Sequence, residues 1–147
     1  MKVAALIEQY NTERPNNIED SMKMSWLRKL EMLIIEEVIN THEHDEADNS
    51  ELGLKVSGST LYITPGGSLA DHIASFNMDS TLLIPEEYDD VYMYYLDQRI
   101  ALDQNDTRRY NTAATAYNNA MLVYQQYYNR THMPLKKRNH LIDHRNI

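Results

Sequence analysis

The helical part of this chain is encoded most plainly by residues 85–134, which read PEEYDDVYMYYLDQRIALDQNDTRRYNTAATAYNNAMLVYQQYYNRTHMP. Between Pro85 and Pro134 there is neither glycine nor proline, the two residue types that most strongly interrupt helices. Apolar and aromatic side chains recur there every three or four residues, which is the spacing of one helix face. Only the polar string Asp103–Asp106, rich in helix-capping residues, breaks the pattern. The stretch predicts two antiparallel helices joined at that string, with one bent helix as the alternative.

Each of these two predicted helices carries one stripe of large side chains. The stripe of the first consists of Tyr88, Val91, Tyr92, Tyr95, Leu96 and Ile100. The stripe of the second consists of Tyr110, Ala113, Ala114, Tyr117, Met121, Tyr124 and Tyr128. Tyrosine buries a large ring but needs a hydrogen-bond partner for its hydroxyl. Such stripes are therefore typical of partly solvated contacts between helices and of protein interfaces. Packing within the chain's own bundle is the first interpretation for most of these residues, and association with another subunit is the second.

The first part of the chain predicts two more helices. Apolar residues at helical spacing predict one helix over Lys2–Arg14, which Pro15 ends. Asn17 suits the N-cap of a second helix. Pro85 suits the first turn of the helix predicted to follow it. We expect the buried stripe of the second helix to be Trp26, Leu27, Leu30, Leu33, Ile34 and Val38. We expect its other faces to carry Arg28, Lys29, Glu31 and Glu36.

Between these helical halves the sequence changes character, and all four glycines lie there. Residues 42–51 are polar and acidic and predict a loop. Alternating apolar residues on both sides of Ser57–Ser59 predict a short β-hairpin over Leu52–Thr64, and Ser68–Asn77 predicts a brief helical turn. The expected fold is therefore mainly α: a helical bundle of about four helices with a small β-hairpin insertion at about residues 43–78 and an extended C-terminal tail.

Composition sets limits on the function. The chain has 147 residues, no cysteine, and 14 basic against 22 acidic side chains, for a formal charge of −8. Without cysteine there is no disulfide framework, thiolate nucleophile or Cys-ligated zinc. The longest apolar runs, Val3–Ile7 and Ala120–Tyr124, are far shorter than a membrane span. We therefore expect one soluble intracellular domain with no membrane contact.

The charge is distributed unevenly. Residues 130–147 hold five bases and one acid, a charge of +4, whereas the rest of the chain holds nine bases and 21 acids, a charge of −12. Nucleic-acid binding needs clustered lysine and arginine, so the acidic body argues against a surface that grips DNA or RNA. The plain interpretation of the basic end is a solvated, partly disordered terminus.

One string has the side chains of a metal site. His42–Glu46 reads HEHDE, but its spacing matches neither the helical His-Glu-x-x-His motif nor another ligand pattern. A solvated loop is the expected interpretation. The sequence also has no Gly-x-Ser-x-Gly elbow and no phosphate-binding glycine loop. We expect no enzyme activity, no metal and no cofactor; a metal-dependent enzyme that uses His42 and His44 is the least favoured hypothesis.

A longer pattern resembles a known family. It consists of Leu82–Tyr92 followed by Tyr95-Leu96, of Arg109–Asn111, Tyr117-Asn118 and Tyr127–Pro134, and, near the start of the chain, of Arg14–Asn16, Trp26-Leu27 and Glu36–Ile39. These strings resemble the head–tail connector (adaptor or neck) proteins of tailed bacteriophages. The most specific is Tyr127–Pro134, which reads YYNRTHMP, because no generic helical pattern explains it. Residues 43–78 depart from the family pattern.

The resemblance implies a structural subunit. Such connectors form a ring, usually twelve-fold, beneath the portal and extend the DNA channel toward the tail; they belong to the virion and, during assembly, to the host cytoplasm. The implied partners are further copies of the chain, the portal protein, a downstream tail or neck protein, and DNA that passes through the lumen without sequence-specific binding. Residues 1–129 correspond to a helical connector domain and residues 130–147 to a basic C-terminal extension.

The resemblance also implies roles for particular residues. Docking to the portal or to a neighbouring subunit falls to Arg130, His132, Pro134, Lys136, Lys137 and Arg138. Packing between helices or between subunits falls to Trp26, Tyr88, Tyr92, Tyr95, Tyr110, Tyr117, Tyr124 and Tyr128. The alternative for the whole chain is a small acidic helical module that regulates a protein partner by sequestering it.

Overall fold

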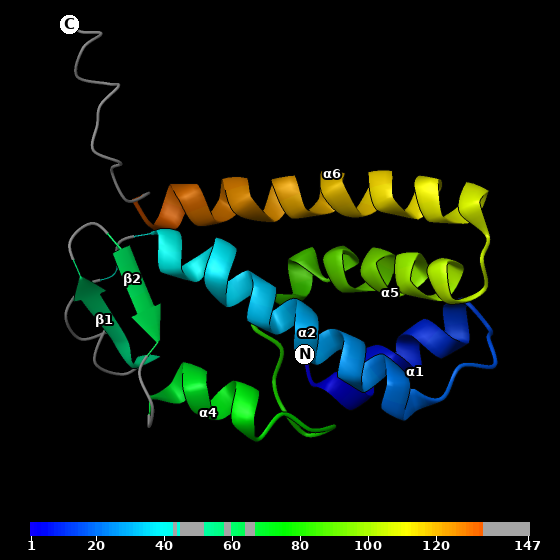
Figure 1. Ribbon diagram of the computed structural model, residues 1–147, viewed down its shortest axis with the longest axis horizontal. Helices are drawn as coiled ribbons and strands as arrows, with labels where there is room; N and C mark the ends of the chain where they lie inside the picture. Colours follow the sequence, from blue (N-terminus) through cyan, green and yellow to red (C-terminus); the bar gives the residue numbers. More distant parts are fainter. Residues whose placement is uncertain (43, 45–51, 58–59, 64–66, 134–147) are drawn as a thin grey trace, which may run out of the picture.

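The computed structural model describes residues 1–42, 44, 52–57, 60–63 and 67–133. In chain order these residues form α1 (Val3–Glu13), α2 (Asp20–Glu37), the 3-10 helix η1 (Ile39–Thr41), β1 (Leu54–Ser57), β2 (Thr60–Ile63), α4 (Ser68–Ala74), the 3-10 helix η2 (Glu86–Tyr88), α5 (Asp90–Asp103) and α6 (Thr107–Thr131). Most of the described residues are helical, so the predicted mainly-α class is confirmed (Figure 1). The predictions for residues 45–51 and for the tail from residue 134 lie outside the described residues.

Helix α1 lies where its apolar stripe predicts. Its buried side chains recur at helical spacing and are Val3, Leu6, Ile7 and Tyr10. The helix ends at Glu13, and Arg14 takes an extended conformation with φ −134° and ψ 80°, because a following proline disfavours helical backbone. At the other end, Leu82 N–H donates a hydrogen bond of 2.9 Å to the carbonyl of Met1, which ties the start of the chain to the segment that precedes η2.

Helix α2 begins later than the sequence predicts. The predicted N-cap, Asn17, is wrong: Glu19 occupies the N-cap position. The reason lies one residue earlier, because the Asn16 side chain accepts a hydrogen bond of 3.0 Å from Ile18 N–H, a turn that holds residues 16–18 outside the helix. A second correction concerns Glu31, which was expected on a face other than the buried stripe and is completely buried.

The middle of the chain forms one end of the molecule (Figure 1). Strands β1 and β2 pair antiparallel with Leu54 opposite Ile63 and Ser57 opposite Thr60. The base of this pair is tight, since a Cβ atom on Gly67 would lie 2.3 Å from Gly53 Cα. Helix α4 then packs on α2: Leu69 is buried. Arg28 on α2 also donates a hydrogen bond of 2.9 Å from its Nε to the Ile73 carbonyl on α4.

Helices α5 and α6 form an antiparallel pair, so the two-helix prediction is confirmed and the bent-helix alternative is wrong. The connection turns at Asn105, whose φ of 57° is left-handed. Asp106 caps α6 by accepting a hydrogen bond of 3.1 Å from Arg109 N–H. Pro85 does not start α5 directly, because the 3-10 turn η2 intervenes. Helix α6 continues to Thr131, past the expected end of the helical domain at residue 129.

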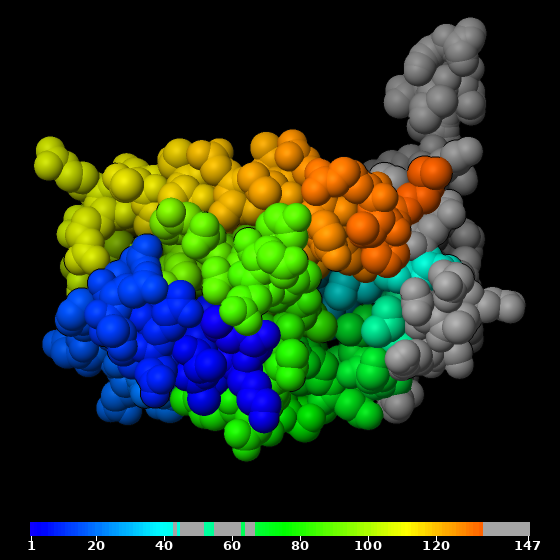
Figure 2. Space-filling model, turned by 180° about the vertical axis from the view of Figure 1, so that it is seen from behind, coloured from blue at the N-terminus to red at the C-terminus, as the bar shows by residue number. Residues whose placement is uncertain are grey.

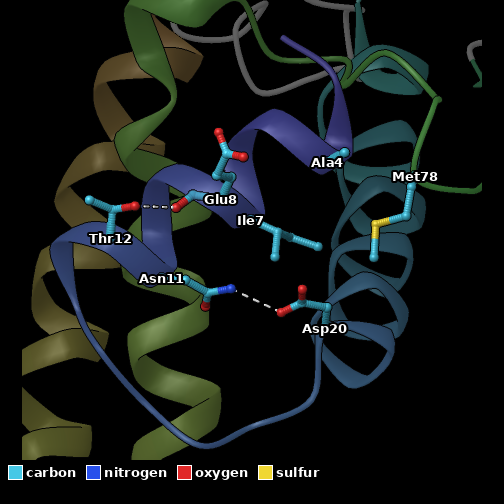
Figure 3. Close-up of a pocket in the computed structure, with 7 residues that line it drawn as sticks. All are labelled: Ala4, Ile7, Glu8, Asn11, Thr12, Asp20 and Met78. Carbon is cyan, nitrogen blue, oxygen red and sulfur yellow. Dashed lines mark hydrogen bonds between the residues drawn. The ribbon is translucent and has the colours of Figure 1, made fainter.

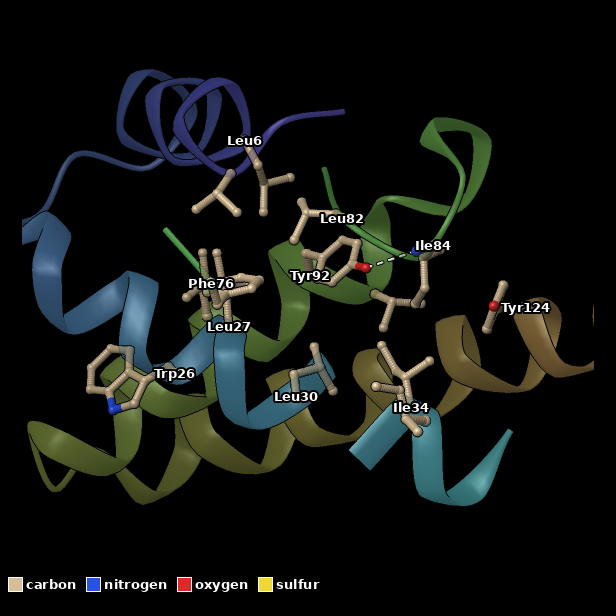
Figure 4. Close-up of a cluster of buried hydrophobic side chains, with 14 of the residues drawn as sticks. Leu6, Trp26, Leu27, Leu30, Ile34, Phe76, Leu82, Ile84, Tyr92 and Tyr124 are labelled. Atoms are coloured by element: carbon tan, nitrogen blue, oxygen red, sulfur yellow. Dashed lines mark hydrogen bonds between the residues drawn. The ribbon is translucent and has the colours of Figure 1, made fainter. Parts of the chain in front are cut away.

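The main core lies where α1, α2 and α5 meet. Figure 4 shows side chains from these helices and from the segment before η2 converging there: Leu6, Leu27, Leu30, Leu82, Ile84 and Tyr92. Each of them is almost completely removed from solvent. One side of α6 packs against this core. The opposite side of the helix is exposed to solvent along its length.

Candidate functional site

The C-terminal part of α6 extends beyond the helix on which it packs. Helix α6 has 25 residues and α5 has 14, which correspond to lengths of about 37 Å and about 21 Å. The overhang continues across η2, where the Tyr88 ring lies 4.9 Å from the Tyr127 ring. It ends beside η1, at the end of the molecule that also carries β1 and β2 (Figure 1). This end of α6 is where the predicted C-terminal extension begins.

A cluster of one tyrosine and three histidines lies at this point, and we call it the α6 end cluster: Tyr128, His132, His42 and His44. The Tyr128 ring stacks on the His132 ring, with 4.2 Å between centroids and 11° between planes. It meets the His42 ring edge-on at 4.8 Å. The rings of His44 and His132 are also 4.8 Å apart. The cluster thus joins the last turn of α6 to the segment that follows α2.

Hydrogen bonds fix the histidine side of this cluster. His42 is buried, and its Nδ1 donates to the Val38 carbonyl at 2.6 Å. Its Nε2 lies at hydrogen-bond distance from the side-chain oxygen of Asn129 on α6. The Nε2 atom of His44 lies 3.0 Å from the Ile39 carbonyl. The first and third of these bonds are local, whereas the bond from His42 to Asn129 joins residues 87 positions apart and holds the end of α6 beside η1.

The predicted docking residues fall partly within the described chain. Arg130 is exposed in the last turn of α6, and His132 is half-buried at its C-cap. The remaining four, Pro134, Lys136, Lys137 and Arg138, lie outside the described residues. The structure brings His132 beside the two histidines that the sequence offered as metal ligands. Even so, the described residues contain no group of three or more ligand side chains placed to hold a metal.

The predicted packing residues lie at helix seams within the chain. Tyr92, Tyr124, Trp26 and Tyr128 are buried, and Tyr88, Tyr95, Tyr110 and Tyr117 are half-buried. Tyr95 and Tyr117 face each other across α5 and α6, with ring centroids 5.6 Å apart. The guanidinium of Arg99 lies over the Trp26 ring at 5.3 Å, a cation–π contact. The tyrosine stripes therefore join helices of one chain, and other residues form the outer side of α6.

That outer side is a surface the sequence analysis missed. It is formed by side chains that are all exposed, and we call it the outer face of α6: Asn111, Thr112, Thr115, Asn118, Asn119, Leu122, Val123 and Gln126. Leu122 and Val123 are 53% and 51% exposed. Figure 2 shows α6, in yellow to orange, as one long edge of the molecule. The available signal was residues 110–129, a run without any charged side chain.

A groove borders this face. It has a volume of about 440 Å³ and lies between α2 and α6. Leu33, Glu37 and Val38 line its α2 side, and Met121, Leu122 and Asn118 line its α6 side. Leu122 belongs to both the groove and the outer face, so the two form one continuous surface with an apolar centre.

A buried carboxylate lies beneath α2. Glu31 Oε1 accepts hydrogen bonds from Leu83 N–H at 2.8 Å and from His72 Nε2 at 2.9 Å. Its Oε2 accepts one from the Tyr92 hydroxyl at 2.7 Å, which itself accepts the Ile84 N–H at 2.9 Å (Figure 4). Burial raises the pKa of the Tyr92 phenol, and the nearby Glu31 raises it further. Both carboxylate oxygens of Glu31 and the hydroxyl of Tyr92 thus have hydrogen-bond partners. This network fixes the segment before η2 to α2.

A second groove, shown in Figure 3, lies between α1 and the start of α2. Its volume is about 470 Å³, and Asn11 donates a hydrogen bond of 2.9 Å to Asp20 across it. Behind these residues Lys23 is buried, with its Nζ donating to Asn11 Oδ1 at 2.7 Å and to the Ile18 carbonyl at 2.8 Å. Asn11, Asp20 and Lys23 bond to one another, which is the arrangement of a structural loop anchor.

Comparison with known proteins gives no further guide. No protein-family model, no curated protein and no solved structure matches this chain. Among the described helices, none is both long and apolar enough to cross a membrane. The resemblance to phage connector proteins therefore stays a prediction made from the sequence.

Proposed function

We propose that this chain is a structural subunit of a tailed-phage head–tail connector. In this proposal it assembles into a ring, of the twelve-fold order usual for that family, attaches to the portal and extends the DNA channel toward the tail. It is a component of the virion, formed in the host cytoplasm, and acts without catalysis, metal or cofactor. The sequence strings that resemble the family support this proposal, and the α6 end cluster supplies its structural argument.

The α6 end cluster is the observation that carries the proposal. A docking segment is effective when its point of departure is fixed, because a fixed start reduces the conformational entropy lost on binding. The stacking of His132 on Tyr128 and the bonds of His42 to Val38 and Asn129 supply such a point. The basic residues 130–147 follow directly, so the proposed extension leaves the body from a defined place.

The charge distribution supports the same role. The extension carries five bases and one acid, whereas the body carries 21 acids and nine bases. A basic segment is attracted to an acidic surface, which on this proposal belongs to the portal or to the body of a neighbouring copy. An acidic body repels DNA and lets it slide through a lumen, where a basic body would hold it.

The proposal also assigns the finer architecture. Residues 1–129 are the connector domain, a bundle built mainly on α1, α2, α5 and α6. Residues 43–78, which contain the β1–β2 pair, are an insertion, and residues 130–147 are the docking extension with Arg130, His132, Pro134, Lys136, Lys137 and Arg138 as its contact residues.

Size-exclusion chromatography with light scattering tests the proposal. The full chain is mixed with the portal ring of the phage that encodes it, and we expect co-elution in a stoichiometric complex. The variant Lys136→Glu/Lys137→Glu/Arg138→Glu is expected to lose this complex. The matched control Lys2→Glu/Lys29→Glu/Arg108→Glu makes the same change in net charge at three bases of the body that are exposed and is expected to retain it.

The same measurement distinguishes the connector from the alternative function, a module that sequesters a protein partner. A sequestering module forms a one-to-one complex with a partner and remains a monomer of 17.2 kDa by itself and beside portal rings. A chain that never co-elutes with portal contradicts the connector proposal. Equal loss of binding in both charge variants contradicts the docking role of the extension, because net charge alone then explains the effect.

A further inference from the structure

We infer that the outer face of α6 is the surface through which one copy of this chain binds a second copy. The inference deepens the proposed function, and it rests on that function in that a ring requires one such contact from each subunit to the next. It assigns the contact to a surface distinct from the C-terminal extension.

Helix α6 is exposed along one side but carries no charged side chain over residues 110–129. A helix that faces water normally carries charged side chains on that side. The exposed side of α2 follows this rule with Arg28, Lys29, Glu36 and Glu37. On α6, by contrast, no charged residue occurs from 110 to 129. The exposed positions in that run are threonines, amides, a leucine and a valine.

The outer face of α6 has an apolar centre. Leu122 and Val123 lie next to each other and are each about half exposed, at 53% and 51%. Leu122 continues into the groove of about 440 Å³ that Leu33 and Met121 also line. Apolar side chains ringed by amides and hydroxyls have the composition of a protein interface, with a dry centre and a polar rim.

The net charge of the chain indicates which kind of molecule binds the outer face of α6. The chain carries a charge of −8, so two copies repel each other wherever their charged surfaces meet. A charge-free face lets two like-charged molecules approach without this repulsion. A basic partner, in contrast, would be matched by carboxylates on the surface that binds it. The face without charge therefore fits a second copy of the same acidic chain.

The size of the face predicts the strength of the contact. Twenty helical residues are about 30 Å long and a helix is about 10 Å wide, a footprint on the order of 300 Å². A stable interface buries about 800 Å² on each partner, so the outer face needs the α2–α6 groove to enlarge the contact. Glu37 is the one charged residue that lines this groove, so the enlarged contact is charge-free on α6 and carries one carboxylate on α2. In a ring the outer face of one copy meets a different surface of the next copy, because a face that paired with itself would close a dimer. We expect one such contact to be weak and the closed ring, in which every subunit makes two contacts, to be stable.

The test uses the full chain and two double variants of unchanged net charge. Leu122→Lys/Val123→Glu places charges on the outer face. Met22→Glu/Leu102→Lys makes the same exchange at two other exposed apolar residues, 48% and 53% exposed. Sedimentation velocity over a concentration series, with and without portal rings, is the measurement, and unfolding followed by circular dichroism checks that both variants fold.

We expect wild type and the control variant to form assemblies of several 17.2 kDa chains and the outer-face variant to remain monomeric. If the outer-face variant assembles as wild type does, the inference is wrong. If wild type remains monomeric at every concentration and on portal rings, the inference is also wrong. Self-association without any portal binding contradicts the proposed connector and leaves the inference intact, so the two failures are distinguishable.

A second readout avoids disrupting the face. Because the chain contains no cysteine, a nitroxide spin label can be placed at one position through Asn119→Cys or, as the control, Lys29→Cys. Both positions are exposed on helices. On concentrating the protein we expect the label at 119 to become immobilised, or to block assembly, and the label at 29 to do neither. Equal mobility of the two labels in assembled protein contradicts the inference.

Discussion

His132 contacts Tyr128 through both its ring and its backbone. Their rings stack with 4.2 Å between centroids, and His132 N–H donates a hydrogen bond of 2.8 Å to the Tyr128 carbonyl. The backbone bond completes the last turn of α6, and the stacked rings close the C-cap beside His44. The end of the helix is thus fixed by side chains as well as by backbone, within the first residues of the basic extension 130–147.

Removing the stacked ring is therefore expected to loosen the end of α6. A stacked aromatic pair contributes about 0.5–1.5 kcal/mol, so His132→Ala should raise amide hydrogen exchange at residues 129–132 about two- to tenfold. Hydrogen–deuterium exchange with mass spectrometry measures this change. Met133→Ala, at a side chain 63% exposed, is the control, and equal exchange in the two variants contradicts the anchoring role of the stack.

The hydroxyl of Tyr92 is expected to contribute strongly to stability. Tyr92→Phe leaves both Glu31 Oε2 and the Ile84 N–H without this partner. An unsatisfied buried polar group costs about 1–3 kcal/mol, so the free energy of unfolding should fall by at least that amount in urea denaturation. Tyr94→Phe, at a half-buried tyrosine of the same helix, should cost less than about 0.5 kcal/mol. Equal losses of unfolding free energy in the two variants would contradict a stabilising role of the Tyr92 hydrogen bonds.

The buried carboxylate itself gives a larger prediction. Glu31→Ala removes the acceptor of three hydrogen bonds, from Leu83, His72 and Tyr92, and is expected to reduce the free energy of unfolding by about 3–5 kcal/mol. Glu36→Ala, at an exposed glutamate of the same helix, should change it by less than about 0.5 kcal/mol. Chemical denaturation of both variants provides the comparison, and similar midpoints are the contradicting outcome.

Alkaline titration is expected to separate the tyrosines into groups. Burial raises the pKa of Tyr117 to about 12, and it also raises the pKa values of Tyr10, Tyr92, Tyr95 and Tyr124. Above pH 10 the unfolded chain therefore loses phenolic protons that the folded chain keeps, so stability falls as pH rises from about 10 toward 12. Ultraviolet difference absorbance of tyrosinate measures this, and titration of all eleven tyrosines as one ordinary group contradicts it.

Local pattern predicted much of the helical structure. The stripe from Trp26 to Val38 located α2, and the polar string at 103–106 located the turn between α5 and α6, because side-chain periodicity and capping act over a few residues. The start of α2 was predicted wrongly, because the bond from Ile18 N–H to the Asn16 side chain forms a turn before the helix and Glu19, not Asn17, takes the N-cap. Such a choice depends on side-chain geometry that a residue pattern does not contain.

The partners of buried polar groups could not be predicted from the sequence. Glu31 occurs in a helix with exposed charges on both sides of it in the sequence, and its bonding partners are 41 to 61 residues away. For the same reason His42 and His44 were considered as an isolated loop, although Tyr128 and His132 complete their surroundings. The outer face of α6 is different, because its charge-free run was visible in the sequence and only its exposure required the structure.

Electron microscopy of the full chain mixed with portal rings tests the central claim most directly. The proposed connector predicts class averages with an additional ring of density, coaxial with the portal and on one side of it, and a loss of that density with Lys136→Glu/Lys137→Glu/Arg138→Glu. Portal rings without added density, in the presence of excess folded chain, would contradict the account.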